Sequence, residues 1–113
     1  MAKSGGADYV AADRSMSDKE KSSGEFLTKE LTIANRAGLH ARPASQFVNA
    51  AKRFVSDIFL EKDGEKISGK SLIGLLLLGI GPGGKVTLYV KGADAPDAIA
   101  ELEALVIGNF GET

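Results

Sequence analysis

Beyond its N-terminal part, the chain alternates between two spacings of apolar residues, and this alternation limits the folds it can adopt. Leu27, Leu31 and Ile33 share one face of an extended segment, whereas Phe47 and Ala51 recur at helical spacing. The spacing predicts four strands, around 27–33, 56–61, 65–68 and 86–91, and three helices, around 41–53, 72–77 and from Asp94 or Ala95 to Val106.

The predicted elements follow one another in the order β-α-β-β-α-β-α. Asp63-Gly64 is a strong signal for a hairpin turn, Ser71 is a good N-cap, and Gly79 is placed to end the short helix that follows. Strands that alternate and helices with one apolar stripe favour an antiparallel sheet with the helices on one face. The fold class is therefore predicted to be α+β.

Composition limits the size and the partners of this domain. The 113 residues suffice for one domain, which we expect over residues 26–113, with residues 1–25, rich in Ser, Gly, Asp and Lys, as a flexible extension. The formal charge of −1 lacks the basic excess of a nucleic-acid binder. Apolar runs are too short to insert into a membrane, and the N-terminus lacks the apolar stretch of a signal peptide. We therefore expect a cytoplasmic protein.

Cysteine is absent and His40 is the only histidine, so disulfides, thiolate metal sites and multi-histidine metal clusters are excluded. His40 lies at the start of the predicted first helix, with Pro43 in its first turn. Unpaired backbone amides and the positive end of the helix dipole favour an anion there. Arg42 adds a guanidinium, and an imidazole nitrogen is nucleophilic near neutral pH. The segment could therefore carry a phosphoryl group on His40.

Two other interpretations of His40 compete with the phosphoryl carrier: a purely structural side chain and a catalytic base. A lone histidine before a helix is often a capping or solvated side chain. A hydrolase or acyltransferase that uses His40 as a base is disfavoured, because the sequence offers no evident nucleophile or acid partner.

The segment Gly38-Leu39-His40-Ala41-Arg42-Pro43-Ala44 resembles the active-site signature of the HPr family, the histidine-containing phosphocarriers of the bacterial sugar phosphotransferase system. The segment from Lys70 to Ile80 resembles the regulatory serine motif of the same family. The resemblance covers roughly residues 26–106 and implies an open-faced β-sandwich, with a four-stranded antiparallel sheet covered by three helices. The sequence departs from the common pattern at Ala37, where an Asn often precedes the glycine.

The resemblance also implies roles for individual residues. His40 would accept a phosphoryl group from enzyme I and pass it to enzyme II A domains, so the protein would be a carrier and not an enzyme. Arg42 would neutralise the phosphoryl oxygens, and Pro43 would help to hold the geometry. Ser71 would be the target of the ATP-dependent HPr kinase/phosphorylase. No cofactor and no metal are expected.

The apolar run after Ser71 cannot face the core throughout so short a helix. We expect Leu75 and Leu78 to point inward. Leu72, Ile73 and Leu76 are expected to form part of a docking surface near His40. Ser45 and Asn49 of the first helix are expected to border that surface. The alternative is that most of the apolar run is buried.

A second function stays open beside the carrier role. Phosphorylation of Ser71 would make the protein a regulator, with a transcriptional regulator as its partner. Family members that serve only regulation lack the histidine, so the presence of His40 favours the carrier role.

Overall fold

The computed structural model describes residues 25–112, so the predicted extension over residues 1–25 lies almost entirely outside the described residues. Along the described chain the elements are β2 (Leu27–Ile33), α1 (Ala41–Ala51), β3 (Asp57–Lys62), β4 (Glu65–Ser68), α2 (Leu72–Leu78), β5 (Gly84–Lys91), α3 (Ala95–Ile107) and the 3-10 helix η1 (Asn109–Gly111). Their order confirms the predicted β-α-β-β-α-β-α pattern.

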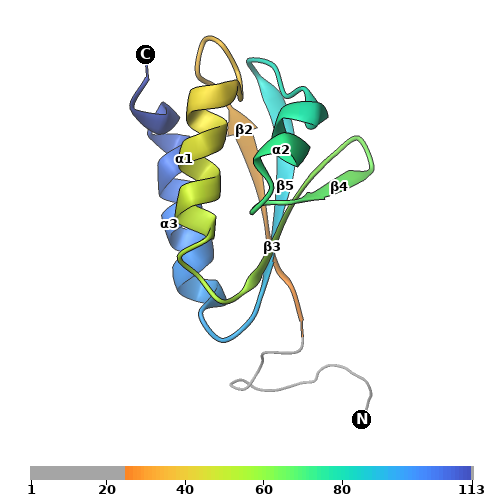
Figure 1. Ribbon diagram of the computed structural model, residues 1–113, viewed down its shortest axis with the longest axis vertical. Coiled ribbons are helices and arrows are strands. Elements are labelled where there is room, and N and C mark those ends of the chain that lie inside the picture. The colour runs from red at the N-terminus through yellow and green to blue at the C-terminus, as the bar shows by residue number, and fades with distance from the viewer. Residues whose placement is uncertain (1–24, 113) are drawn as a thin grey trace.

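The four strands form one antiparallel sheet in the order β2-β5-β3-β4. Leu88 of β5 is opposite Leu60 of β3, and Leu60 is opposite Ile67 of β4. These register pairs bring the apolar residues of neighbouring strands to the same face of the sheet. Figure 1 shows α1 and α3 side by side along the sheet, with α2 beside the upper part of α1.

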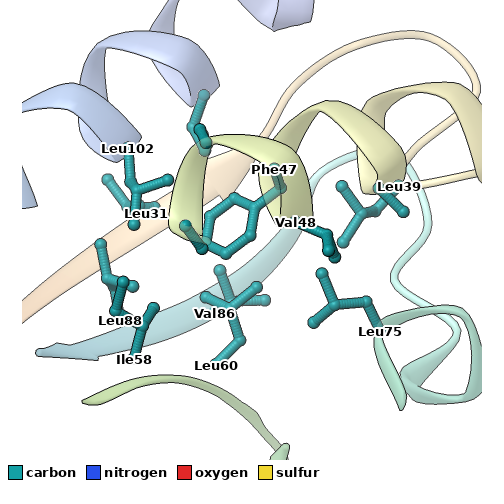
Figure 2. Close-up of a cluster of buried hydrophobic side chains, with 14 of the residues drawn as sticks. Leu31, Leu39, Phe47, Val48, Ile58, Leu60, Leu75, Val86, Leu88 and Leu102 are labelled. Atoms are coloured by element: carbon teal, nitrogen blue, oxygen red, sulfur yellow. The ribbon is translucent and has the colours of Figure 1, made fainter. Parts of the chain in front are cut away.

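The core lies between the sheet and the helices, and each helix contributes fully buried side chains to it. Figure 2 shows Phe47 of α1, Leu75 of α2 and Leu102 of α3 directed toward the strand residues. The strand side chains labelled in the same cluster are Leu31, Ile58, Leu60, Val86 and Leu88. The predicted α+β open-faced sandwich, with its helices on one face, is therefore confirmed.

The opposite face of the sheet has no helix over it in the described chain, and aromatic side chains gather there. Phe26 contacts Phe59 and Tyr89 edge-on, with ring centroids 5.9 and 6.1 Å apart. The ammonium group of Lys66 lies 4.0 Å from the centroid of Tyr89 and covers the cluster. This packing gives the open face a partial apolar cover of its own.

Element boundaries differ from the prediction by one or two residues at several places; the last strand, for example, begins at Gly84 rather than Val86. Two of the differences have a cause in the hydrogen bonding. The first helix ends at Ala51 rather than Arg53, because Arg53 N–H turns back to the carbonyl of Ala50. The second predicted strand begins at Asp57 rather than Ser56, whose amide is bound by a carboxylate from a distant segment. The 3-10 helix η1 was not predicted, because no apolar periodicity marks three residues.

Candidate functional site

The loop that leads to His40 is fixed by backbone hydrogen bonds. Gly38 N–H donates to Asn35 O at 3.0 Å, and Leu39 N–H donates to Ile80 O at 2.9 Å. Gly38 has φ of +71°, and a Cβ there would lie 2.6 Å from Ile80 O. Only glycine fits both the left-handed conformation and this close approach. The turn after α2 thus holds the segment that ends on His40.

His40 occupies the N-cap position of α1 but does not use its ring to cap the helix. Its backbone is extended, with φ of −85° and ψ of −168°, and its carbonyl accepts from Ala44 N–H at 2.9 Å. The side chain makes no cap hydrogen bond and is 43% exposed. The capping interpretation is therefore wrong, and the ring can be reached from outside the protein.

The first turn of α1 surrounds this ring with positive polarity. The amides of Ala41 and Arg42 precede the first intrahelical hydrogen bond, and Pro43 has no N–H to offer. Pro43 is buried and fixes the start of the helix, whereas Arg42 is exposed. An anion bound to His40 would lie at the positive end of the helix dipole and close to a guanidinium.

A carboxylate from the far end of the chain contacts the ring, and sequence analysis missed it. Glu112 Oε1 and Oε2 lie 3.2 and 3.1 Å from His40 Nε2. Asn35 Nδ2 donates to Glu112 Oε1 at 2.9 Å and to Gly38 O at 2.7 Å. Figure 1 likewise places the end of the described chain beside the start of α1.

Glu112 is held in its charged form by these neighbours. The hydrogen bond from Asn35 is the largest cause that lowers the pKa of Glu112, followed by the hydrogen bond and charge of His40 and the charge of Arg42, while partial desolvation opposes them. The carboxylate therefore belongs electrostatically to the same site as His40 and Arg42.

Ser71 uses its side chain differently from His40. Ser71 Oγ accepts from Gly74 N–H at 3.0 Å and caps α2, as predicted. The preceding Lys70 extends to the end of α1, where Nζ donates to Phe54 O at 2.8 Å. Ser71 is half-buried. Lys70 and Ser71 therefore tie the start of α2 to the segment that follows α1.

The apolar residues of α2 divide as their helical positions require. Leu75 and Leu78 are buried, as predicted. Leu72 is half-buried against the core and Leu76 is 37% exposed, so both are partly exposed, as expected. Residues four apart share a helix face, and the most exposed pair is Ile73 with Leu77, at 68% and 76%. Leu77 had not been predicted to be part of the surface.

Two predicted residues of α1 have different surroundings. Ser45 is half-buried and Asn49 is exposed. Asn49 lines a shallow groove between α1 and α3 with Arg53 and Glu101, which places it on the α3 side of the helix. The structure records no hydrogen bond or ion pair from either residue to His40 within residues 25–112.

Neither a metal centre nor a membrane span is found in the described part of the chain. Residues 25–112 hold no group of three or more His, Cys, Asp or Glu side chains that could bind a metal ion. Over the same residues, no helix combines the length and the apolar character needed to cross a membrane.

Comparisons with known proteins bear on this site. A family model described as the PTS HPr component phosphorylation site matches residues 27–107. The chain is 45% identical over 81 residues to the HPr-like protein Crh of Bacillus subtilis, which covers 72% of this chain and 95% of that protein. It is 37% identical over 87 residues to the phosphocarrier protein HPr of Cupriavidus necator; the match covers 77% of this chain and 98% of that protein. A crystal structure of HPr-C-His from Thermoanaerobacter tengcongensis matches with a TM-score of 0.75 and 41% identity, over 77% of this chain and 98% of that one.

An open-faced α+β sandwich with an accessible histidine at the start of its first helix defines a class of small phosphocarriers. The chain belongs to the HPr family of the phosphotransferase system. Proteins of this family are phosphocarriers and not enzymes, and membership implies enzyme I and enzyme II components as partners.

Proposed function

We propose that His40 accepts a phosphoryl group from enzyme I and donates it to an enzyme II A domain. The observation that carries the proposal is that α1 does not use the ring: His40 is the N-cap of α1, yet its side chain is half-exposed and makes no cap hydrogen bond. Phosphoryl transfer depends mostly on positioning and on stabilising charge. The fixed loop before His40 provides the positioning, and the start of α1 stabilises the charge.

Arg42 and Pro43 have supporting roles in this proposal. The Arg42 guanidinium neutralises oxygens of the bound phosphoryl group, because its charge already acts on a carboxylate that touches His40. Pro43 is buried in the first turn and keeps the helix start from fraying.

The experiment is incubation with enzyme I and phosphoenolpyruvate, followed by intact-mass measurement before and after acid treatment. Wild type should gain one acid-labile phosphate, because the phosphoramidate bond of phosphohistidine breaks in acid. His40→Ala should gain none while keeping its fold. Wild type that stays unmodified beside an active control carrier would refute the proposal.

The exposed apolar residues of α2 support a docking surface for these partners. We assign Ile73, Leu76 and Leu77 to it, with Leu72 and Ser45 at its border. Asn49, which was expected to border it, lies on the α3 side of α1 and is left out. Such a patch next to a charged reactive centre suits transient association. Ile73→Glu should therefore slow phosphorylation by enzyme I at least about tenfold and leave stability unchanged.

The matched control for Ile73→Glu is Val55→Glu. Val55 is 79% exposed and lies beyond the far end of α1. It tests whether a new charge on any exposed apolar residue has the same effect. Equal rates for wild type and Ile73→Glu would remove α2 from the docking surface.

A second function is favoured by one observation, the similarity to Crh, which a solved structure describes as the catabolite repression HPr of Bacillus subtilis. On this hypothesis HPr kinase/phosphorylase modifies Ser71, and the modified protein acts on a transcriptional regulator in the cytoplasm. A phosphate at the start of α2 is compatible with the helix dipole. Mass spectrometry after incubation with a cognate kinase and ATP should find phosphate on wild type and none on Ser71→Ala. Unmodified wild type would count against it.

A further inference from the structure

The contact between Glu112 and His40 fixes the position of a proton. Both carboxylate oxygens lie within 3.2 Å of Nε2, and the pKa of Glu112 is lowered, so the group is ionised near neutral pH. An ionised carboxylate only accepts hydrogen bonds. Nε2 must therefore donate, and in the neutral ring the lone pair is on Nδ1.

The backbone after α3 is shaped to deliver this carboxylate. Asn109, Phe110 and Gly111 have φ values of +55°, +55° and +75°, so three successive residues are left-handed. This conformation is costly for a bulky residue such as Phe110. Phe110 is buried in the core, and Glu112 N–H donates to Asn109 O at 2.8 Å. The carboxylate is thus mounted on a packed turn and is not a free end.

Asn35 joins the turn to the loop before His40. Its side chain is 1% exposed, and one amide nitrogen donates both to Gly38 O and to Glu112 Oε1. The group that aligns Glu112 is therefore anchored to the loop that sets the position of the ring. A carboxylate that met His40 by chance would not need a buried partner of this kind.

We propose that Glu112 is a positioning residue for His40, which keeps the proton on Nε2 and pairs with it while Nδ1 carries the phosphoryl group. This inference rests on the carrier role. The Nδ1 lone pair attacks phosphorus, the new P–N bond forms, and the bond between phosphorus and the donor breaks, with its electron pair going to the donor. The Nε2 proton stays in place, so the phosphorylated ring is a cation that faces the Glu112 carboxylate.

That pairing sets the pH range over which the phosphoryl group can be passed on. A protonated ring leaves phosphorus as neutral imidazole, which is a better leaving group than its anion. Two charged groups act on the phosphorylated ring: Glu112, from the turn, and Arg42, from α1. Glu112 favours the protonated ring and Arg42 opposes it, and Glu112 is the group in direct contact.

The test compares Glu112→Gln with wild type after phosphorylation by enzyme I. Gln keeps the size and an acceptor oxygen but removes the charge. The pH midpoint of the phosphohistidine signal in phosphorus NMR should fall by about one unit. Above that midpoint, hydrolysis should slow by up to about tenfold, in proportion to the protonated fraction. Glu101→Gln is the matched control, because Glu101 pairs with Arg53, beyond the other end of α1; it should change neither quantity.

Two outcomes would overturn the inference. One is an unchanged midpoint and lifetime in Glu112→Gln. The other is faster phosphorylation of Glu112→Gln with an unchanged midpoint, which would make the carboxylate a competitor of the incoming phosphoryl group. Either result leaves the carrier role intact, because phosphohistidine has formed. Failure of wild type to form phosphohistidine would refute the carrier role itself.

Discussion

The starts of α1 and α2 use their N-cap side chains in opposite ways. His40 stands at the N-cap position of α1 without a side-chain cap and turns its ring toward Glu112, whereas the hydroxyl of Ser71 accepts from Gly74 N–H. Both positions present an accessible helix N-terminus, where an added phosphate is electrostatically favoured. They differ in whether the side chain is already needed by the helix.

This difference separates the consequences of changing each residue. Loss of the His40 ring removes chemistry and leaves the hydrogen bonds of α1 in place. Loss of the Ser71 hydroxyl leaves a donor at the start of α2 without its partner. A side chain that its helix does not need can be modified and restored repeatedly without disturbing the fold, which is what a carrier requires.

The largest effect on stability is expected from a change at Gly38, in the loop that leads to His40. Gly38→Ala should lower the free energy of unfolding by about 2–4 kcal/mol, because the new Cβ meets the backbone of residues 80–81 and the residue stays left-handed. Urea denaturation measures the loss. Phosphorylation by enzyme I should fall as well, since the loop ends on His40.

Gly79→Ala is the control for Gly38→Ala. Gly79 also has a positive φ, of +63°, but a Cβ there meets nothing within 4 Å. Only the conformational cost remains, about 1 kcal/mol. Equal losses in the two variants would show that the contact between the His40 loop and Ile80 contributes nothing.

The second-largest effect on stability is expected from loss of the Ser71 side-chain cap of α2. Ser71→Ala should lower the free energy of unfolding by about 1 kcal/mol, because Gly74 N–H loses its acceptor. Ser71→Asp should recover most of that loss, since a carboxylate also caps a helix start. Thermal or urea unfolding of both variants decides the matter. If Ser71→Ala is as stable as wild type, the two helix starts do not differ as described.

The start of α3 is a third case, in which the N-cap side chain binds a different segment and its contribution to stability depends on pH. Asp94 accepts from the amides of Val55 and Ser56 at 2.9 and 3.0 Å and from Ser56 Oγ at 2.5 Å. The Ser56 hydroxyl is the largest cause that lowers the pKa of Asp94, and the Val55 amide follows. A lowered pKa stabilises the fold above the ordinary value of 3.8, and that contribution is lost as the pH falls through the folded-state pKa.

Asp94→Asn should therefore be less stable than wild type near neutral pH, and the difference should shrink below about pH 4. The effect should be smaller than that of Ser71→Ala, because Asn keeps one acceptor oxygen. Urea unfolding at several pH values tests this. A difference that stays constant down to about pH 3 would contradict the assigned role of the carboxylate.

Much of the fold could be predicted because its causes are local. The alternation in Val86, Leu88 and Val90 and the helical spacing around Phe47 each follow from side chains that must face one core. The N-cap role of Ser71 follows from its hydroxyl and from the residues after it. The position of His40 at a helix start was predicted on the same grounds.

The rest of the site depends on contacts between distant segments. Glu112 meets His40 across 72 positions of the chain through a turn of left-handed residues that no apolar pattern marks. The burial of Asn35 depends on the same tail, whereas its sequence context indicates only a loop. The exposure of Leu77 could have been found by placing it four residues after Ile73 on the same helix face.

One paired measurement tests whether His40 carries the phosphoryl group without being needed for the fold. His40→Ala and Ser71→Ala are incubated with enzyme I and phosphoenolpyruvate, weighed by intact-mass spectrometry, and unfolded in urea. His40→Ala should gain no phosphate and stay within about 0.5 kcal/mol of wild type, whereas Ser71→Ala should gain one acid-labile phosphate. An acid-labile phosphate on His40→Ala, or its absence from folded Ser71→Ala, would contradict the role of His40 as the carrier residue.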